Sequence, residues 1–150
     1  MSANKIDLTK KCRQLLVDNN IPITRPRILL LEILLENKGP LKVEQVIKLS
    51  KGSIAISSLY RVINDLKNLG LISEFQTLEN TKVIELASVK GEHHHHIFCK
   101  SCGAVDDFEI NTSLENDLEQ EIQKIESLYN ISVLSHSLEL LSLCHKCKTN

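Results

Sequence analysis

Residues 93–102 read HHHHIFCKSC, and residues 144–147, near the end of the sequence, read CHKC. Four imidazoles and two thiols lie within ten consecutive residues, and a second pair of thiols is available to join them. Nitrogen and sulfur side chains at this density are typical of metal sites. We therefore expect the second half of the chain to bind metal. The first half of the chain is the place to look for the function that the metal supports.

The cysteines form two Cys-x-x-Cys pairs, Cys99 with Cys102 and Cys144 with Cys147. This spacing lets both thiolates of a tight turn bind one ion, and two such pairs complete the tetrahedron of four thiolates that Zn²⁺ accepts. Gly103 follows Cys102 directly and favours the sharp turn beneath the metal. A cytosolic chain disfavours disulfides, and two matched pairs disfavour a redox site. The sequence predicts a structural zinc site.

The histidine run lies inside the chain, where a cloning tag is unusual, and it leads into an expected strand. Alternate side chains of an extended segment point to opposite sides. His93 and His95 therefore face one way, and His94 and His96 face the other. One run can contribute to two metal sites, each completed by ligands from elsewhere. The candidate ligands are Glu85, Asp107, Glu115 and His136.

The composition is 42% hydrophobic, 25% charged and 3% aromatic, which is typical of a soluble protein with an aliphatic core. The sequence shows neither a membrane-spanning run nor a secretory leader, so we expect a cytoplasmic location. Residues 1–90 hold 14 Lys and Arg against 9 Asp and Glu, whereas residues 91–150 hold 4 against 10. A basic first half suits an anionic partner such as nucleic acid, although a solvated charged face is the commoner explanation.

Apolar residues at helical spacing predict four helices in the first half, through residues 8–16, 28–35, 43–47 and 56–69. Thr24 is the expected N-cap of the second helix. Cys12 is expected to be a small buried residue of the first. The buried stripe expected on the fourth helix consists of Ile56, Leu59, Ile63 and Leu66.

The outer face of the fourth helix is polar and lacks the usual excess of Glu and Lys. It carries Ser57, Tyr60, Arg61 and Asn64. Such side chains suit a helix that enters the major groove of DNA. Two strand-like segments follow, 71–77 and 82–86, with Asn80 in the turn between them. This order predicts a winged helix-turn-helix, and the alternative is a small helical domain with a hairpin and no DNA role.

The second half predicts strands at residues 104–108 and 131–143 and a helix at residues 114–125. The fold class is therefore α+β. Residues 88–92 resemble a linker, and the composition changes across them from basic to acidic. We expect a first domain over residues 1–88, a hinge over 89–92 and a metal-binding domain over 93–150.

Four motifs together resemble the ferric uptake regulator (Fur) family: TRPR at 24–27, SLYRV at 58–62, the HHHHxxCxxCG run at 93–103, and SHSLE at 135–139 before the last cysteine pair. The resemblance extends from about residue 8 to residue 148. It implies a dimeric transcriptional repressor rather than an enzyme. It also implies a winged-helix DNA-binding domain, a small C-terminal α/β dimerisation domain, and a divalent metal as co-repressor. The implied partners are an operator in double-stranded DNA and a second copy of the chain, with neither a membrane nor a small-molecule substrate.

The resemblance also assigns residues to sites. The structural zinc would be held by Cys99, Cys102, Cys144 and Cys147. The regulatory metal between domains would be held by Glu85, His94, His96 and Asp107. An additional metal within the second domain would be held by His93, His95, Glu115 and His136. DNA would be contacted by Tyr60 and Arg61, and the helix face and segment before the second helix would add Ser57, Asn64, Arg25 and Arg27.

Three positions depart from the family pattern. Pro40 stands where the regulatory site usually takes a histidine, Pro22 where many members place a DNA-contacting lysine, and His95 where iron-responsive members commonly have aspartate. Oxygen and nitrogen donors at the regulatory site suit Fe²⁺ or Mn²⁺, whereas the all-histidine run resembles zinc-responsive members. Iron is favoured as the regulatory metal, and the alternatives are zinc and manganese or peroxide sensing.

Two other classes of protein are alternatives. A metal-dependent hydrolase would need an open coordination position with a general base beside it, and no ligand set of this sequence offers an evident one. A zinc-storage protein could use the histidines alone. It would not need the polar face of the fourth helix.

Overall fold

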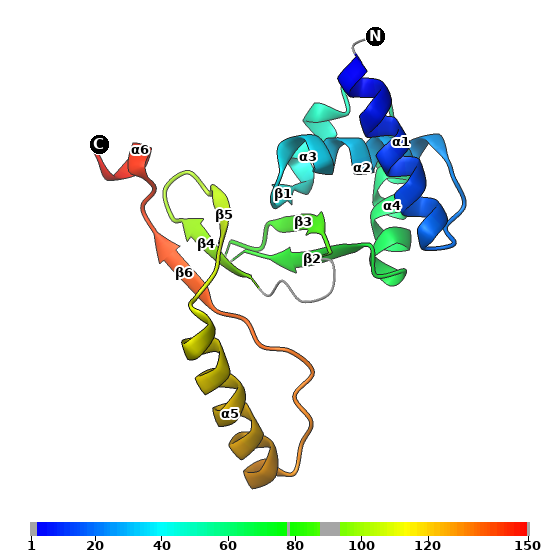
Figure 1. The fold of residues 1–150 in the computed structure, drawn as a ribbon. Helices are drawn as coiled ribbons and strands as arrows, with labels where there is room; N and C mark the ends of the chain where they lie inside the picture. The colour runs from blue at the N-terminus through cyan, green and yellow to red at the C-terminus, as the bar shows by residue number, and fades with distance from the viewer. Residues whose placement is uncertain (1–2, 78, 88–93, 150) are drawn as a thin grey trace. The chain divides into compact units, whose positions relative to one another are not determined.

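The computed structural model describes residues 3–77, 79–87 and 94–149, and the chain divides into two compact units, Met1–Ser88 and Val89–Asn150. The predicted hinge at 89–92 and the predicted ligand His93 lie outside the described residues. No helix in the described ranges is both long and apolar enough to cross a membrane. The elements of the first unit (Figure 1) are α1 Ala3–Asp18, α2 Arg25–Asn37, β1 Leu41–Lys42, α3 Val43–Leu49, α4 Ile56–Asn68, β2 Ile72–Gln76 and β3 Lys82–Leu86.

The first unit combines four helices with an antiparallel sheet of order β1-β3-β2, the arrangement of a winged helix-turn-helix. Its core is aliphatic, as the composition predicts, and draws on all four helices and the sheet. Cys12 is fully buried in this core, which confirms the prediction for it. Burial and the neighbouring Glu32 carboxylate raise the pKa of its thiol to about 11. Cys12 is therefore a packing residue and an unreactive thiol.

α4 forms at the predicted position because its apolar residues recur at helical spacing and meet the core. Leu59, Val62, Ile63 and Leu66 are buried. The prediction that Ile56 belongs to this stripe is wrong, since Ile56 is 56% exposed. It is the first residue of the helix, and side chains lean towards the helix N-terminus, where no preceding turn covers it. The helix ends at Asn68 with Leu69 as its C-cap, and Gly70 takes the left-handed φ of +74° that redirects the chain towards β2.

The second unit is a small three-stranded sheet with one long helix. Its elements are β4 His95–Cys99, β5 Val105–Phe108, α5 Thr112–Tyr129, β6 Glu139–Ser142 and α6 His145–Lys148. The sheet order is β5-β4-β6, with β4 and β6 parallel. Asn111 caps α5 by accepting a hydrogen bond from the Leu114 N–H at 2.8 Å.

The strand predicted over residues 131–143 is wrong in length, since only Glu139–Ser142 pairs with β4. Residues 131–138 instead return alongside α5 (Figure 1). The Val133 N–H donates to Oε1 of Glu126 at 2.7 Å, so this backbone group bonds to the helix and not to a strand. The leucines at alternate positions of this segment are exposed: Leu134 at 96%, Leu138 and Leu140.

Candidate functional site

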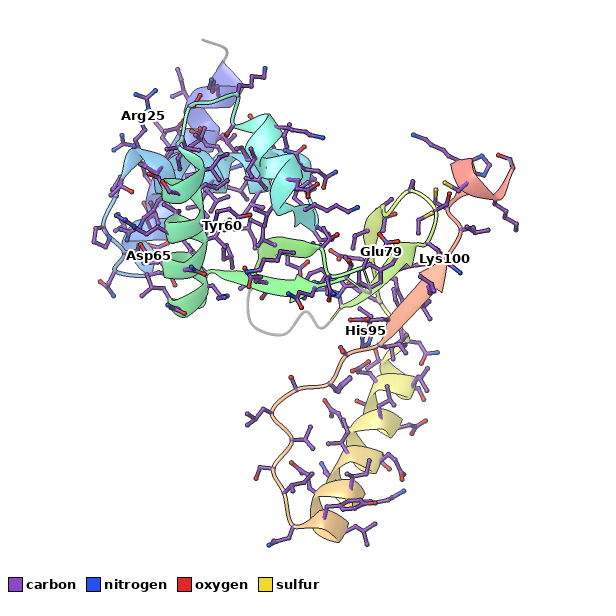
Figure 2. The ribbon with its side chains drawn as sticks, turned by 180° about the vertical axis from the view of Figure 1, so that it is seen from behind. Arg25, Tyr60, Asp65, Glu79, His95 and Lys100 are labelled. Atoms are coloured by element: carbon purple, nitrogen blue, oxygen red, sulfur yellow. The ribbon has the colours of Figure 1, made fainter. Side chains whose placement is uncertain are left out.

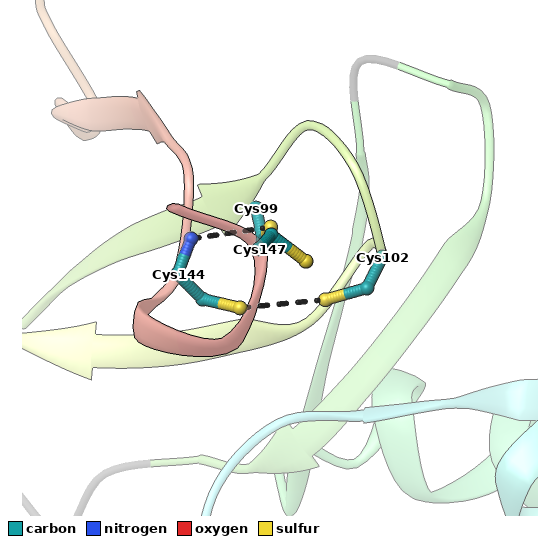
Figure 3. A group of neighbouring side chains, drawn as sticks. All are labelled: Cys99, Cys102, Cys144 and Cys147. Atoms are coloured by element: carbon teal, nitrogen blue, oxygen red, sulfur yellow. Dashed lines mark hydrogen bonds between the residues drawn. The ribbon is translucent and has the colours of Figure 1, made fainter. Parts of the chain in front are cut away.

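The four C-terminal cysteines come together at the end of the second unit (Figure 3). Cys99 is the last residue of β4, and the turn that follows it carries Cys102 and closes with a hydrogen bond from the Gly103 N–H to the Cys99 carbonyl at 2.8 Å. Gly103 has a φ of +67°, as a sharp turn requires. Cys144 precedes α6, and Cys147 lies within it. Two separate turns thus present one thiol pair each.

The geometry of the thiols fits a tetrahedral zinc ion. All four sulfur atoms lie within 4.8 Å of one another, and Sγ of Cys102 is 3.7 Å from Sγ of Cys144. The sulfur atoms around a zinc ion with bonds of about 2.3 Å are separated by about 3.8 Å. Backbone hydrogen bonds from Cys102 and Cys144 lower the pKa of the Cys99 thiol to about 6. Thiolate is the form that binds metal.

A second donor cluster joins β4 to α5 and to the segment before β6. Nε2 of His95 lies 3.3 Å from one carboxylate oxygen of Glu115, and Nε2 of His136 lies 2.7 Å from the other. His95 is 1% exposed, so its ring is enclosed by the fold. Two imidazoles and a carboxylate within such a distance are a donor set that divalent transition metals accept.

The hydrogen bonds of His95 indicate which ring nitrogen carries its hydrogen. The backbone N–H of Leu138 donates to Nδ1 at 3.1 Å, so the neutral ring carries its hydrogen on Nε2 and directs it to Glu115. A metal bonded to Nε2 would require the hydrogen on Nδ1, where it would meet the Leu138 N–H. The donor types therefore fit a metal, and coordination through Nε2 would require Leu138 to move away from His95.

The third cluster lies on the other side of β4. The donor atoms of His94, His96 and Asp107 lie within 4.8 Å of one another, and Nε2 of His96 is 3.6 Å from Oδ1 of Asp107. His96 and Asp107 are partners in the β4–β5 register. The expected alternation thus holds for the three described histidines. Glu85 belongs to β3 of the first unit, where it is 6% exposed and pairs with Ser73 of β2.

The polar face of α4 is exposed as predicted. Tyr60, labelled in Figure 2, is 40% exposed, and Ser57, Arg61 and Asn64 are exposed beside it. Short hydrogen-bonding side chains near the helix N-terminus, with an arginine and a tyrosine, can reach base edges and phosphates. This face has no role in the core of the unit.

Arg25 and Arg27, both predicted as DNA contacts, differ in their surroundings. Arg25 is exposed. The Arg27 side chain is 15% exposed, donates to the Pro22 carbonyl at 2.8 Å and forms an ion pair with Asp65 of α4 at 3.3 Å. Arg27 therefore ties the start of α2 to α4, and only Arg25 is kept in the proposed DNA surface. No local pattern of residues predicts this pair, because its members are 38 residues apart.

Comparison with known proteins agrees with this architecture. The sequence profile of the ferric uptake regulator family matches residues 18–141. The chain belongs to the ferric uptake regulator family. It is 31% identical over 139 residues to a ferric uptake regulation protein of Legionella pneumophila, an alignment that covers 90% of this chain and 97% of that protein.

Solved structures of the Fur family agree with the fold. The Vibrio cholerae ferric uptake regulator is 29% identical, with a TM-score of 0.68 over 87% of this chain and 98% of that one. The Helicobacter pylori regulator is 24% identical, with a TM-score of 0.69 over 95% and 92%. The protein is thus a metal-responsive regulator of a family of transcriptional regulators. Its cysteine cluster fits the C-terminal zinc site of the Fur fold.

Proposed function

We propose that the protein is a homodimeric transcriptional repressor that binds its operator when a divalent metal occupies its regulatory site, with Fe²⁺ as the first candidate. The proposal rests on the presence of two features in one chain. The second unit holds nitrogen and oxygen donors that are separate from its cysteine cluster, and the first unit presents a polar helix face that its core does not use. A metal-responsive DNA-binding protein needs both features.

The regulatory site of this proposal consists of Glu85 from the first unit and His94, His96 and Asp107 from the second. The donor set is two imidazoles and two carboxylates, which suits Fe²⁺ or Mn²⁺ and contains no thiolate. Pro40 replaces the histidine that the family usually adds, so a water molecule is the expected fifth ligand. A divalent ion would supply coordination bonds to both units at once.

The positions of the proposed ligands in the chain indicate how a shared metal ion would affect DNA binding. Glu85 is the second-last residue of β3, in the wing, and His94 immediately precedes β4. Donors fixed within two sheets define one relative orientation of the units when they share an ion. Metal would then select this orientation from many, and the selected orientation would bind the operator more tightly.

A second copy of the chain is the proposed partner in solution. Among the described residues β6 pairs only with β4, which leaves one edge of the sheet available. α5 has no buried residue, and its neighbourhood exposes large apolar side chains. Those most exposed are Leu128, Tyr129, Ile131, Leu134, Leu141 and Leu143. An apolar surface of this kind beside an open sheet edge suits a self-complementary interface.

Zinc is the second candidate for the regulatory metal, favoured by His95 at a position that carries aspartate in iron-responsive members. Zinc binds almost any nitrogen and oxygen site more tightly than iron or manganese. Binding of a metal alone therefore cannot identify the signal. Manganese or peroxide sensing is the remaining alternative within the family.

The test is binding to the protein's own promoter DNA at buffered free Fe²⁺, Mn²⁺ and Zn²⁺. We expect metal to raise the operator affinity about 5- to 150-fold, the usual range of a coupling free energy. Fe²⁺ should act at free concentrations that are physiological for iron, although Zn²⁺ binds more tightly. A scrambled duplex of equal length is the control. Equal affinity for both duplexes, or an affinity that no metal changes, would contradict the proposal, and a response to Zn²⁺ alone would assign the chain to zinc sensing.

A further inference from the structure

A basic groove lies within the first unit. It has a volume of about 760 Å³ and is bounded by α1, by the start of α2 and by the loop before α4. Lys5, Thr9 and Arg13 line it from α1, where a spacing of four residues places them on one side of the helix. Arg25 and Ser53 line it from the other segments. Two cationic side chains of α1 and one at the start of α2 thus line the same groove.

The cationic side chains of this groove are unpaired among the residues that the structure describes. In the part of the chain that the structure describes, Lys5, Arg13 and Arg25 make no side-chain hydrogen bond or ion pair, whereas Arg27 and Lys67 pair with carboxylates. The groove contains one carboxylate, Glu32, which accepts a hydrogen bond from the Thr9 hydroxyl at 2.6 Å. The formal charge of the lining residues is therefore positive. An anionic ligand is complementary to it.

The position of the groove relates it to α4. Ser53 lies three residues before Ile56, where α4 begins, so the groove opens beside the N-terminal end of that helix. Arg25 is drawn towards this end of α4 in Figure 2. The N-terminal residues of a recognition helix contact base edges in the major groove, and the phosphates of both strands border that groove.

We propose that this groove receives a phosphate of the same duplex whose bases α4 reads. α1 and the first residue of α2 would thereby extend the DNA-binding surface beyond the recognition helix. The inference rests on the proposed DNA-binding function and adds Lys5 and Arg13 to it. Arg25 provides one guanidinium that can bind a phosphate bidentately, and Arg13 provides a second from α1.

The test measures how operator affinity of the metal-loaded full chain depends on salt between about 50 and 200 mM. Each lost phosphate contact reduces the slope of log K against log salt by about 0.9, so Arg13→Gln should reduce it by about 1.8 in a dimer and weaken binding about 30-fold at about 0.15 M salt. Glu32→Gln removes the carboxylate from the groove and should tighten binding.

Lys11→Gln is the matched control. It removes the same charge from α1, but Lys11 lies about 200° around the helix from Thr9 and pairs with Asp7 at 3.3 Å. Its slope should equal that of the wild type. The same slope for Arg13→Gln and Lys11→Gln would overturn the assignment of the groove to DNA. Tighter DNA binding by Arg13→Gln would also overturn it, because it would mean that an acidic segment of the chain occupies the groove and competes with DNA. Arg61→Gln shows whether the groove or the proposed function has failed. If Arg61→Gln loses operator binding and Arg13→Gln does not, only the groove assignment is overturned. If the wild type itself shows no specific binding, the proposed DNA-binding function is overturned as well.

Discussion

Cys102→Ser is expected to abolish zinc binding and unfold the second unit while the first unit remains folded. Among residues 94–149 only His95, Phe98 and Cys99 are buried, so the apolar core of this unit is far too small to stabilise it alone. Structural zinc contributes about 10–16 kcal/mol in small zinc domains, and that binding free energy is folding free energy. Zinc content and the amide NMR spectrum would measure both effects, with the resonances of residues 94–149 losing dispersion.

Cys12→Ala is the control for the loss of a thiol. It removes a cysteine of the first unit that lies outside the zinc cluster, so it should retain one tightly bound zinc per chain and a folded second unit. Some loss of stability is expected in the first unit from the cavity that it leaves. Wild-type zinc content in Cys102→Ser, together with an unchanged denaturation midpoint, would show that the four thiols do not form a structural zinc site.

The features that could be predicted from the sequence are those in which local spacing fixes the geometry. A Cys-x-x-Cys turn holds its two sulfur atoms together wherever it lies, and only the meeting of Cys99 and Cys102 with Cys144 and Cys147 needed the fold. The polar face of α4 follows from the helical period. The alternation of His95 and His96 follows in the same way from the geometry of a strand.

The features that could not be predicted depend on which distant group a residue meets. Residues 131–143 have a strand-like pattern, but only four of them pair with β4, because the earlier residues lie along α5. Leu134 fits the alternation and is still 96% exposed, so the pattern matches a surface that this chain alone does not cover. The Arg27–Asp65 ion pair and the basic groove likewise combine segments whose approach no local spacing reveals.

A substitution at His96 tests metal sensing with the least effect on folding. Its side chain is 14% exposed and faces Asp107, whereas its backbone pairs with Asp107 of β5 and Glu139 of β6. Alanine keeps those backbone hydrogen bonds and removes one nitrogen donor of the proposed regulatory site. The cysteine cluster lies at the far end of β4 and uses none of the same atoms.

We expect His96→Ala to retain its zinc and its dimer and to lose the metal-dependent part of operator binding. The proposed site would keep three protein donors, too few to fix the orientation of both units. Metal is expected to raise the operator affinity of the wild type about 5- to 150-fold, and it should leave the operator affinity of the variant unchanged. Titration of operator affinity with Fe²⁺, alongside zinc analysis and sedimentation, measures all three properties. His145→Ala is the matched control, since His145 lies in α6 outside the three donor clusters and should respond to metal as the wild type does. A wild-type metal response in His96→Ala would exclude this histidine from the regulatory site, and loss of the dimer would assign it a structural role instead.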